Sequence, residues 1–326
     1  IIAASLDISG DIDVDGTTNL DIVDVDGAVN FAADVTFADG ADIITASAGT
    51  GNLRLGVNAG NSIESGGNYN VVVGNEAGTA ITTGDYNTAV GTNALDATTT
   101  TDYNTALGYD SLTTNITGAT NTALGAHTLK ANTTGSSNVA IGFGSLDVST
   151  TASNNVAIGY DSGGANTTGH SNVAIGRDAM LTEDTGRKNV AIGYQALRVQ
   201  NSDADNFNTA VGYQAGVAVT TGVKNTFIGG LAGDATTTAS ENVAVGYDSL
   251  GTNILGSHSV AIGPSALRTQ NYGTATNAYN TAVGSFAGYA VTTGTANTLI
   301  GGQAGDAITT GASNVAVGWN SLTTNT

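Results

Sequence analysis

Apolar and small residues recur along the chain with a fixed period. The recurring unit reads Asn, then Val or Thr, then Ala, then Ile or Val, then Gly, and it returns from residue 52 to the C-terminus. Twelve of the fifteen steps between successive glycines share a 17-residue length, and the other three are longer, at 18, 19 and 21. A fixed period of this length predicts a solenoid, in which each repeat packs against its neighbours. The repeat glycines are Gly56, Gly74, Gly91, Gly108, Gly125, Gly142, Gly159, Gly176, Gly193, Gly212, Gly229, Gly246, Gly263, Gly284, Gly301 and Gly318.

Each copy of the unit predicts a short strand with apolar side chains on both faces. The residue before the glycine is apolar in all sixteen copies, and the residue two positions earlier is Val, Thr or Leu. The residue between these two points to the opposite face. It is Ala in twelve copies, and Val72, Phe227 or Leu299 in three more. A strand that is apolar on both faces is expected to be buried on both. One face would fill the interior, and the other would meet a second surface, most simply another copy of the chain.

The Asn and the Gly of the unit have structural interpretations. Asn opens fifteen of the sixteen copies, and Ser259 replaces it in one. Stacked one coil apart, about 4.8 Å, these side chains can form an amide ladder, or each Asn can adopt the left-handed backbone of a corner. The glycine either supplies a turn or lets neighbouring coils approach closely. We therefore assign structural roles to Asn138, Gly142, Asn155, Gly159, Asn172, Gly176, Asn189 and Gly193.

The rest of each repeat is more polar. Ala, Ser or Thr stands three residues after the glycine, followed by Leu, Met or Gly, and often later by Thr-Thr-Gly. We interpret this part as a second short strand and a polar outer turn. The predicted fold of residues 50–326 is all-β: a parallel β-solenoid of about sixteen 17-residue coils, which is a narrow two-sided roll roughly 75 Å long.

A larger duplication is superimposed on the short repeat. Residues 193–262 match residues 263–326 in four successive coils, and the 19-residue and 21-residue steps fall at the same place in each unit. Insertions in a solenoid map to loops on one face. Each unit is therefore expected to carry an enlarged loop at the same position.

Residues 1–49 lack the repeat and hold ten of the 27 acidic residues of the chain. Apolar and polar residues alternate between Leu6 and Val14, which predicts short strands joined by Asp-Gly turns in a neck or stalk. The stretch from Asp11 to Gly16 imitates the start of an EF-hand loop. However, the twelfth loop position is Ile22 where calcium loops have Glu, so solvent-facing Asp is favoured over calcium.

Composition narrows the function classes. The 326-residue chain has a net charge of −19 with only eight Lys and Arg, so neither nucleic acid nor an anionic membrane is expected as a partner. It has no Cys, which excludes disulfides and thiolate metal sites, and no apolar run long enough for membrane insertion. Because the chain opens at Ile1 and stops within a repeat, we expect it to be a piece of a longer protein.

The sequence holds little that indicates catalysis. His127, His170 and His258 occupy different phases of the repeat, and the carboxylates outside the neck are scattered. No Gly-Lys-Ser/Thr motif is present to bind phosphate. Residues 192–197 would pass as a hexapeptide of a left-handed acyltransferase helix, but that signature occurs once per repeat rather than three times per coil. We expect no enzyme activity, no cofactor and no metal.

Aromatic residues are the better candidates for recognition. The position after the repeat glycine holds Tyr109, Phe143, Tyr160, Tyr194, Tyr213, Tyr247 and Trp319, and the enlarged loops add Phe207, Tyr272 and Tyr279. Exposed aromatic rings stack on sugars, and loops on rigid scaffolds carry binding functions. The alternative is that these rings fill a corner of the roll or a contact between chains. The candidates for receptor contact are Phe207, Tyr272, Tyr279, Tyr194, Tyr213 and Trp319.

Two resemblances add expectations about biology. The segments 138–142, 155–159 and 172–176, each reading Asn-Val-Ala-Ile-Gly, resemble the head repeats of trimeric autotransporter adhesins of the YadA type. That resemblance implies a left-handed parallel β-roll, with three rolls packed about one axis. The longer pattern Asn-Thr-Ala-Val-Gly-x-x-Ala-Gly, followed by Thr-Thr-Gly, and the opening stretch from Ile8 to Gly16 are similar to bacteriophage tail-fibre proteins.

The tail-fibre resemblance implies a homotrimeric, non-enzymatic fibre shaft located in the virion. Its partners would be itself, other tail or baseplate proteins, and a glycan or protein on the host surface that it contacts or holds at a distance. The alternative is the head of a trimeric adhesin on the surface of a bacterial cell. A solenoid enzyme, either a depolymerase or an acyltransferase, is the third hypothesis.

Overall fold

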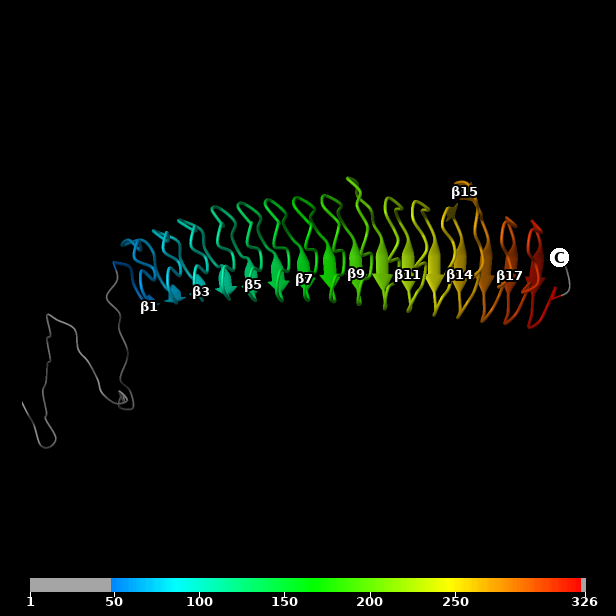
Figure 1. Ribbon diagram of the computed structural model, residues 1–326, viewed down its shortest axis with the longest axis horizontal. Helices are drawn as coiled ribbons and strands as arrows, with labels where there is room; N and C mark the ends of the chain where they lie inside the picture. Colours follow the sequence, from blue (N-terminus) through cyan, green and yellow to red (C-terminus); the bar gives the residue numbers. More distant parts are fainter. Residues whose placement is uncertain (1–47, 324–326) are drawn as a thin grey trace, which may run out of the picture. The chain divides into compact units, whose positions relative to one another are not determined.

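The computed structural model describes residues 48–323, which form one parallel β-solenoid (Figure 1). The predictions of a neck and of calcium-binding Asp residues fall on residues outside this range. Sixteen of the eighteen strands form a single sheet, with one three-residue strand in each coil. The predicted fold class, the 17-residue period and the number of coils are therefore confirmed.

The sixteen strands of the main sheet are β1 (Leu53–Leu55), β2 (Val71–Val73), β3 (Thr88–Val90), β4 (Thr105–Leu107), β5 (Thr122–Leu124), β6 (Val139–Ile141), β7 (Val156–Ile158), β8 (Val173–Ile175), β9 (Val190–Ile192), β10 (Thr209–Val211), β11 (Thr226–Ile228), β12 (Val243–Val245), β14 (Val260–Ile262), β16 (Thr281–Val283), β17 (Thr298–Ile300) and β18 (Val315–Val317). A second, two-stranded parallel sheet consists of β13 (Gly256–Ser257) and β15 (Thr276–Asn277).

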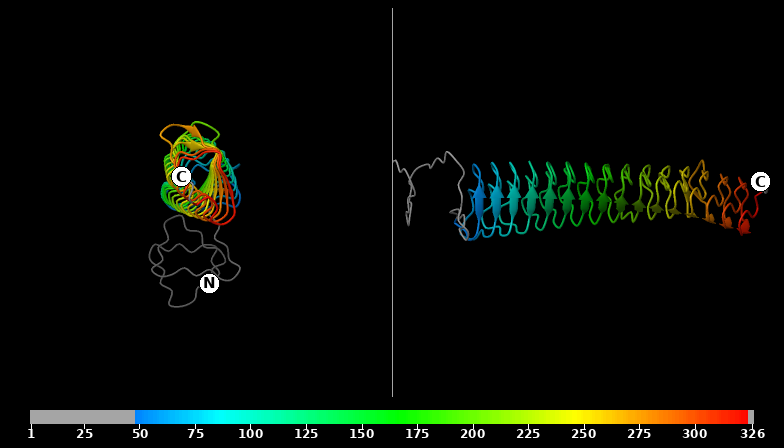
Figure 2. Two further views of the ribbon diagram at one scale, coloured as in Figure 1. Left: turned by 90° about the vertical axis from the view of Figure 1, so that its right-hand side faces the viewer. Right: turned by 90° about the horizontal axis from the view of Figure 1, so that it is seen from below.

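The main sheet keeps the register of the repeat across both enlarged loops. Val190 pairs with Thr209 across the 19-residue step, and Val260 pairs with Thr281 across the 21-residue step. The extra residues project from one edge of the roll, where β15 lies (Figure 2). Insertions therefore change the edge of the solenoid and leave its sheet intact.

The central residue is buried inside the roll in fifteen of the sixteen strands of the main sheet, β2 to β12, β14 and β16 to β18. In β7, Ala157 is 1% exposed, whereas Val156 and Ile158 on either side are only half-buried. Ala predominates at the inner position because the roll is narrow and a Leu or Met from the opposite wall occupies the remaining space. The outer face of the sheet carries the larger β-branched side chains. The structure thus decides which of the two apolar faces is the core.

Three coils carry a larger inner residue, and glycines make room for it. Phe227 is fully buried in β11. A Cβ atom built on Gly233 would lie 2.6 Å from the Phe227 ring, and one built on Gly216 would lie 2.8 Å from it. Leu299 in β17 has the same relation to Gly288 and Gly305, with distances of 2.7 and 2.6 Å. A bulky residue on the sheet wall is thus matched by glycine on the opposite wall.

The Asn side chains form the predicted ladder. Asn155 donates its backbone N–H to Asn138 Oδ1 at 3.0 Å, and Asn172 donates to Asn155 Oδ1 at 2.9 Å. Asn155 Nδ2 also donates to the Gly169 carbonyl at 2.8 Å. The left-handed backbone of this corner belongs to the preceding residue, such as Asn154 with φ 60°. The ladder interpretation is therefore confirmed, and the corner interpretation of the repeat Asn is wrong.

Both interpretations of the repeat glycine are correct. Gly159 has a φ of 135°, a conformation that side chains disfavour. A Cβ atom at this position would also lie 2.7 Å from the carbonyl carbon of Gly176 in the next coil. The glycine column therefore serves the turn and the close approach of successive coils at once.

The predicted second strand in each coil is wrong for the described residues. Outside the main sheet, residues 48–323 contain only β13, β15 and an isolated bridge between Arg187 and Asp205. Turns replace the strand because left-handed residues bend this wall, as at Met180 with φ 50°. Its backbone still bonds from coil to coil, as in the 2.9 Å bond from Gly163 N to Ala179 O.

Candidate functional site

The outer face of the main sheet is a partly exposed surface in which apolar residues predominate, although Thr stands at the first strand position in seven of the sixteen coils. We call it the apolar stripe and define it as the first and third residues of the sixteen sheet strands. Its side chains are half-buried or exposed in all sixteen coils. Leu107, Ile228 and Ile300, for example, are 41%, 41% and 40% exposed. The row of strands that carries the stripe runs along the described part of the solenoid (Figure 1).

One edge of the stripe is bordered by what we call the leading column, the residues two positions before each strand. Its members have left-handed backbones, and at the start of the solenoid they are tyrosines. Tyr69 stacks on Tyr86 with ring centroids 5.0 Å apart, and Tyr86 stacks on Tyr103 at 5.2 Å. All three are about half exposed. The sequence analysis missed this stack, although the even 17-residue spacing of the three tyrosines was a signal for it.

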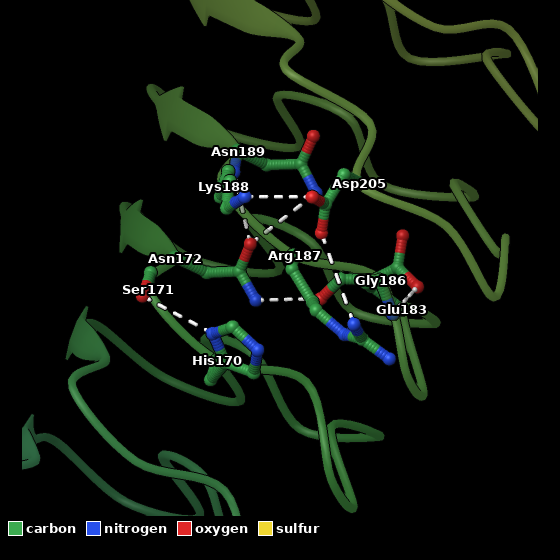
Figure 3. A network of polar contacts seen from close by, with 9 residues as sticks. All are labelled: His170, Ser171, Asn172, Glu183, Gly186, Arg187, Lys188, Asn189 and Asp205. Carbon is green, nitrogen blue, oxygen red and sulfur yellow. Dashed lines mark hydrogen bonds and ion pairs between the residues drawn. The ribbon is translucent and has the colours of Figure 1, made fainter.

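The first enlarged loop delivers Phe207 into the leading column. Lys188 Nζ lies 4.9 Å from the centre of the Phe207 ring and 2.6 Å from Asp205 Oδ2. Figure 3 shows Lys188 and Arg187 converging on Asp205. The hydrogen bond and charge of Lys188 lower the pKa of the Asp205 carboxyl. The loop is thus held against the preceding coil by polar contacts at the surface.

The second enlarged loop delivers Tyr279 into the same column. Tyr279 stacks on His258 with centroids 5.0 Å apart. His258 Nδ1 lies 3.1 Å from Glu241 Oε2, and Lys224 Nζ lies 3.2 Å from Glu241 Oε1. Both enlarged loops therefore place an aromatic ring against a basic side chain, Lys188 for Phe207 and His258 for Tyr279. The two aromatics occupy equivalent positions in the leading column, two residues before β10 and β16.

The other edge of the stripe is bordered by what we call the trailing column, the residues that follow the repeat glycines. Tyr194 stacks on Tyr213 at 5.4 Å, and Phe143 stacks on Tyr160 at 5.6 Å. Trp319 is 77% exposed. In both columns the rings stack along the solenoid axis, so a stacked ring has at least one face covered by its neighbour. Sugars stack on ring faces rather than edges, so this arrangement leaves fewer sugar-binding faces than the sequence indicated.

Tyr272 does not lie on the surface. Its side chain is 6% exposed, and its hydroxyl donates to the Gly294 carbonyl at 2.7 Å and accepts from Asn280 Nδ2 at 3.2 Å. Burial raises the pKa of this hydroxyl to about 12. The prediction that Tyr272 contacts a receptor is therefore wrong. The larger of the two loops folds its first aromatic residue into the core.

An open groove of about 560 Å³ lies on the turn wall. It forms where Gly164 interrupts a row of side chains, and Asp147, Asp161 and Asp184 line it together with Val148 and Leu181. Burial, reinforced by the charge of Asp161, raises the pKa of Asp147. Within residues 48–323 no group of three or more His, Cys, Asp or Glu side chains is placed to hold a metal ion.

The three histidines lie in different surroundings, as their repeat phases predict. His127 lies edge-on between Tyr109 and Phe143, and His258 stacks on Tyr279. His170 contacts the neighbouring Ser171 hydroxyl at 3.2 Å (Figure 3). They do not form a common site.

Comparison with known proteins adds no relative. No protein-family model, curated protein or solved structure matches the chain. In the described part of the chain, no helix has the length and apolar character to span a membrane.

Proposed function

We propose that the chain is a structural, non-enzymatic segment of the shaft of a bacteriophage tail fibre. It assembles as a homotrimer of left-handed rolls through the apolar stripe and carries or spaces attachment to a glycan or protein on the host surface. The observation that carries this proposal is the stripe itself, which continues through every coil and is not interrupted by either insertion.

The size of the stripe supports self-association. Sixteen strands spaced by about 4.8 Å give a length of about 75 Å. With a width of about 10 Å, the stripe covers on the order of 750 Å², which is close to the roughly 800 Å² that each partner buries in a stable interface. Monomeric proteins rarely expose an apolar surface of this size. A second and a third copy fit it best because their stripes have the same length and the same repeat.

The architecture supports a mechanical role. Each strand is bonded to the strands before and after it, and the Asn ladder adds a second row of bonds between coils. Such a rod has no hinge within its sheet. Location in the virion, and docking to tail or baseplate proteins, rest on the resemblance of the repeats to tail-fibre proteins.

Solution mass tests the assembly directly. We expect light scattering to give about three times the 32.1 kDa of one chain. The triple variant Val156→Lys, Val173→Lys, Val190→Lys should be monomeric, because it places three charges on the stripe. The control Thr134→Lys, Thr151→Lys, Thr168→Lys adds the same charge at exposed turn positions and should remain trimeric. A monomeric or dimeric parent chain would contradict the proposal.

Attachment has its own test. The parent chain labelled with a fluorophore should bind host cells, and the double variant Phe207→Ala, Tyr279→Ala should bind less while keeping the same mass. Glycosidase and protease treatment of the cells separates a glycan from a protein receptor. Binding that is unchanged in the double variant would remove the two loops from the proposed contact.

Two other functions have a specific basis. The first is the head of a bacterial trimeric adhesin, which shares the Asn-Val-Ala-Ile-Gly repeats. The coding sequence next to this segment would distinguish an adhesin from a tail fibre. A membrane-anchor barrel would favour the adhesin, and a capsid- or baseplate-docking domain would favour the fibre. A polysaccharide depolymerase would use the groove, where Asp147 and Asp161 are paired. Release of reducing sugar that is lost in Asp161→Asn would support the enzyme.

A further inference from the structure

A column of polar side chains runs through the interior of the solenoid. We call it the interior column and define it as the seventh residue after each repeat glycine. All of its described members up to Ile308 are at most 6% exposed, and seven successive ones are polar. These seven are Thr98, Asn115, Asn132, Ser149, Asn166, Glu183 and Gln200.

Hydrogen bonds in the interior column point in one direction. Asn115 Nδ2 donates to Thr98 Oγ1 in the preceding coil at 3.1 Å, and Asn132 Nδ2 donates to Asn115 Oδ1 at 2.8 Å. Further along, Gln270 Nε2 donates to Asn253 Oδ1 at 3.2 Å. In these three pairs the amide N–H donates a hydrogen bond to the preceding coil, and no bond between two side chains of the column points the other way in the described residues. Asn132 Oδ1 and Ser149 Oγ have no hydrogen-bond partner.

Glu183 stands where this direction requires a donor. The preceding member, Asn166, is 2% exposed, and its Oδ1 has no hydrogen-bond partner. The following member, Gln200, is fully buried, and its Nε2 donor has no partner within ordinary geometry. A carboxylate offers only acceptors and would leave Asn166 Oδ1 unsatisfied. A carboxylic acid has the same pattern as Gln, with a donor for Asn166 and an acceptor for Gln200.

We propose that Glu183 is a neutral carboxylic acid in the folded solenoid and that its O–H donates a hydrogen bond to Asn166 Oδ1. The remaining contacts of Glu183 come from neutral groups. Gly186 N donates to Oε1 at 2.7 Å, Ser202 N donates at 3.4 Å, and Asn206 Nδ2 donates to Oε2 at 3.3 Å. Figure 3 shows the contact with Gly186. Two of the three donors that face Glu183 belong to the first enlarged loop.

The charged groups around Glu183 are engaged elsewhere, except Arg198 in the next coil, whose buried Nε has no hydrogen-bond partner. Arg187 and Lys188 pair with Asp205, and no ion pair joins a described Lys, Arg or His to Glu183. Asp184 accepts from the Thr167 hydroxyl, and Asp203 Oδ1 accepts from Thr185 at 2.6 Å.

Burial has the expected effect on the titration of Glu183. It raises the pKa of the carboxyl above 4.5, and the backbone N–H donors and the Gln200 amide, which lower it, do not outweigh burial. Because the folded pKa is raised, the stability contributed by the acid form is fully present below the ordinary pKa of about 4.5. It is lost as the pH rises through the folded pKa. The solenoid should therefore gain stability from Glu183 on acidification.

Carbon-13 NMR tests the proposal on the full chain. Labelling the carboxyl carbon of glutamate gives only four signals, and Glu183→Gln removes and so assigns one of them. We expect this signal to keep its acid-form shift at pH values where the other three have titrated. Titration of all four signals together near the ordinary value would overturn the proposal. The four residues are Glu64, Glu76, Glu183 and Glu241.

Thermal melting provides the second readout. Glu183→Gln keeps the donor and the acceptor without the charge, so it should melt about 2–4 °C above the parent chain at pH 8 and level with it near pH 4.5. Exposed Glu241→Gln is the control and should not show this trend. A difference between Glu183→Gln and the parent that is the same at every pH overturns the proposal. If Glu183→Gln does not fold, substitutions of the other three glutamates assign the Glu183 signal by elimination.

Discussion

Each of the two duplicated units, residues 193–262 and 263–326, contains one enlarged loop, and the two loops pack differently against the coil before them. In the coil before the first loop, the interior column holds Glu183, and the loop covers it with Asn206. In the coil before the second loop, the column holds Asn253, and the loop inserts Tyr272. Asn206 donates to Glu183 of the interior column, whereas Tyr272 bonds to the Gly294 carbonyl and to Asn280, which lie outside that column. The difference teaches that an enlarged loop is accommodated when a polar side chain inside it finds a buried hydrogen-bond partner. The sheet register is the same in both units.

The two units also differ in core volume. Phe227 of the first unit corresponds to Leu299 of the second, and each is matched by two glycines on the opposite wall. The same two glycine positions flank both residues. The exchange of Phe for Leu therefore shows how far the other side chains and the backbone of the roll adjust to a change in core volume.

The largest effect is expected from emptying these positions. Phe227→Ala should lower the free energy of unfolding by about 3–5 kcal/mol, and Leu299→Ala by about 2–5 kcal/mol, because the flanking glycines leave the cavity unfilled. Urea unfolding followed by circular dichroism measures both. The double variant Phe227→Ala, Gly233→Leu reproduces the pairing of Ala244 with Leu250 in the next coil and should recover part of the loss. Losses below about 1 kcal/mol would contradict the packing described above.

The next effect separates a repeat glycine of the first unit from a loop glycine of the second. Gly246 has a φ of 130°, and a Cβ atom on it would lie 2.6 Å from the carbonyl carbon of Gly263. Gly273 in the second enlarged loop has no left-handed φ, and a Cβ atom on it meets nothing within 4 Å. Gly246→Ala should therefore cost about 1–3 kcal/mol more than Gly273→Ala in urea unfolding. Equal costs would contradict the role given to the glycine column.

Removing the hydroxyl of Tyr272 should cost about 1–2 kcal/mol, because the Gly294 carbonyl loses one of its two buried donors and keeps only Asn280 Nδ2. The folded pKa of Tyr272 is raised from 10.0 to about 12. Its contribution is therefore fully present below pH 10 and is lost as the pH rises through about 12. Melting curves should show the advantage of the parent chain over Tyr272→Phe shrinking across this range. The enlarged loop of the first unit contains no tyrosine, so we expect no corresponding loss of stability at high pH from that loop.

The smallest effect is expected in the Asn ladder. Asn189 stands four residues before Gly193 and corresponds to Ser259, which stands four residues before Gly263, so the fold accepts Ser at this position. Asn189→Ser removes the acceptor of the 3.2 Å bond from Asn208 N and should cost about 1 kcal/mol in urea unfolding. A loss above about 3 kcal/mol would indicate that the ladder is more cooperative than its separate bonds.

The repeat made much of the fold predictable. The alternation of Val, Ala and Ile predicts a strand with two apolar faces, and the constant 17-residue spacing predicts that these strands stack. The turn wall was not predictable in the same way. Residues such as Met180 and Leu197 are ordinary strand or helix formers, and only their position opposite the sheet gives them a left-handed backbone. Local preference was overridden there by packing.

The candidate site was predicted in part. Phe207 and Tyr279 lie on exposed loops as expected, because an insertion in a solenoid can only leave the roll at an edge. Tyr272 is buried, whereas Tyr69, Tyr86 and Tyr103 stack at the surface. Residue type could not predict which tyrosines are buried and which are exposed. A tyrosine has an apolar ring and one polar group, so it fits either a surface row or a buried site with a carbonyl partner.

The sequence by itself determined the parallel solenoid, the number of coils and the place of the insertions, because each follows from period and residue type. It left the repeat Asn open between a ladder and a corner, and the contacts between coils decided for the ladder. Only the tertiary structure decided that Ala faces inwards and that Val and Ile form the apolar stripe. It also decided that Glu183 lies in the interior column between an unpaired acceptor and an unpaired donor. The physical reason is that these properties depend on what stands across the roll and in the next coil, and no local pattern contains that information.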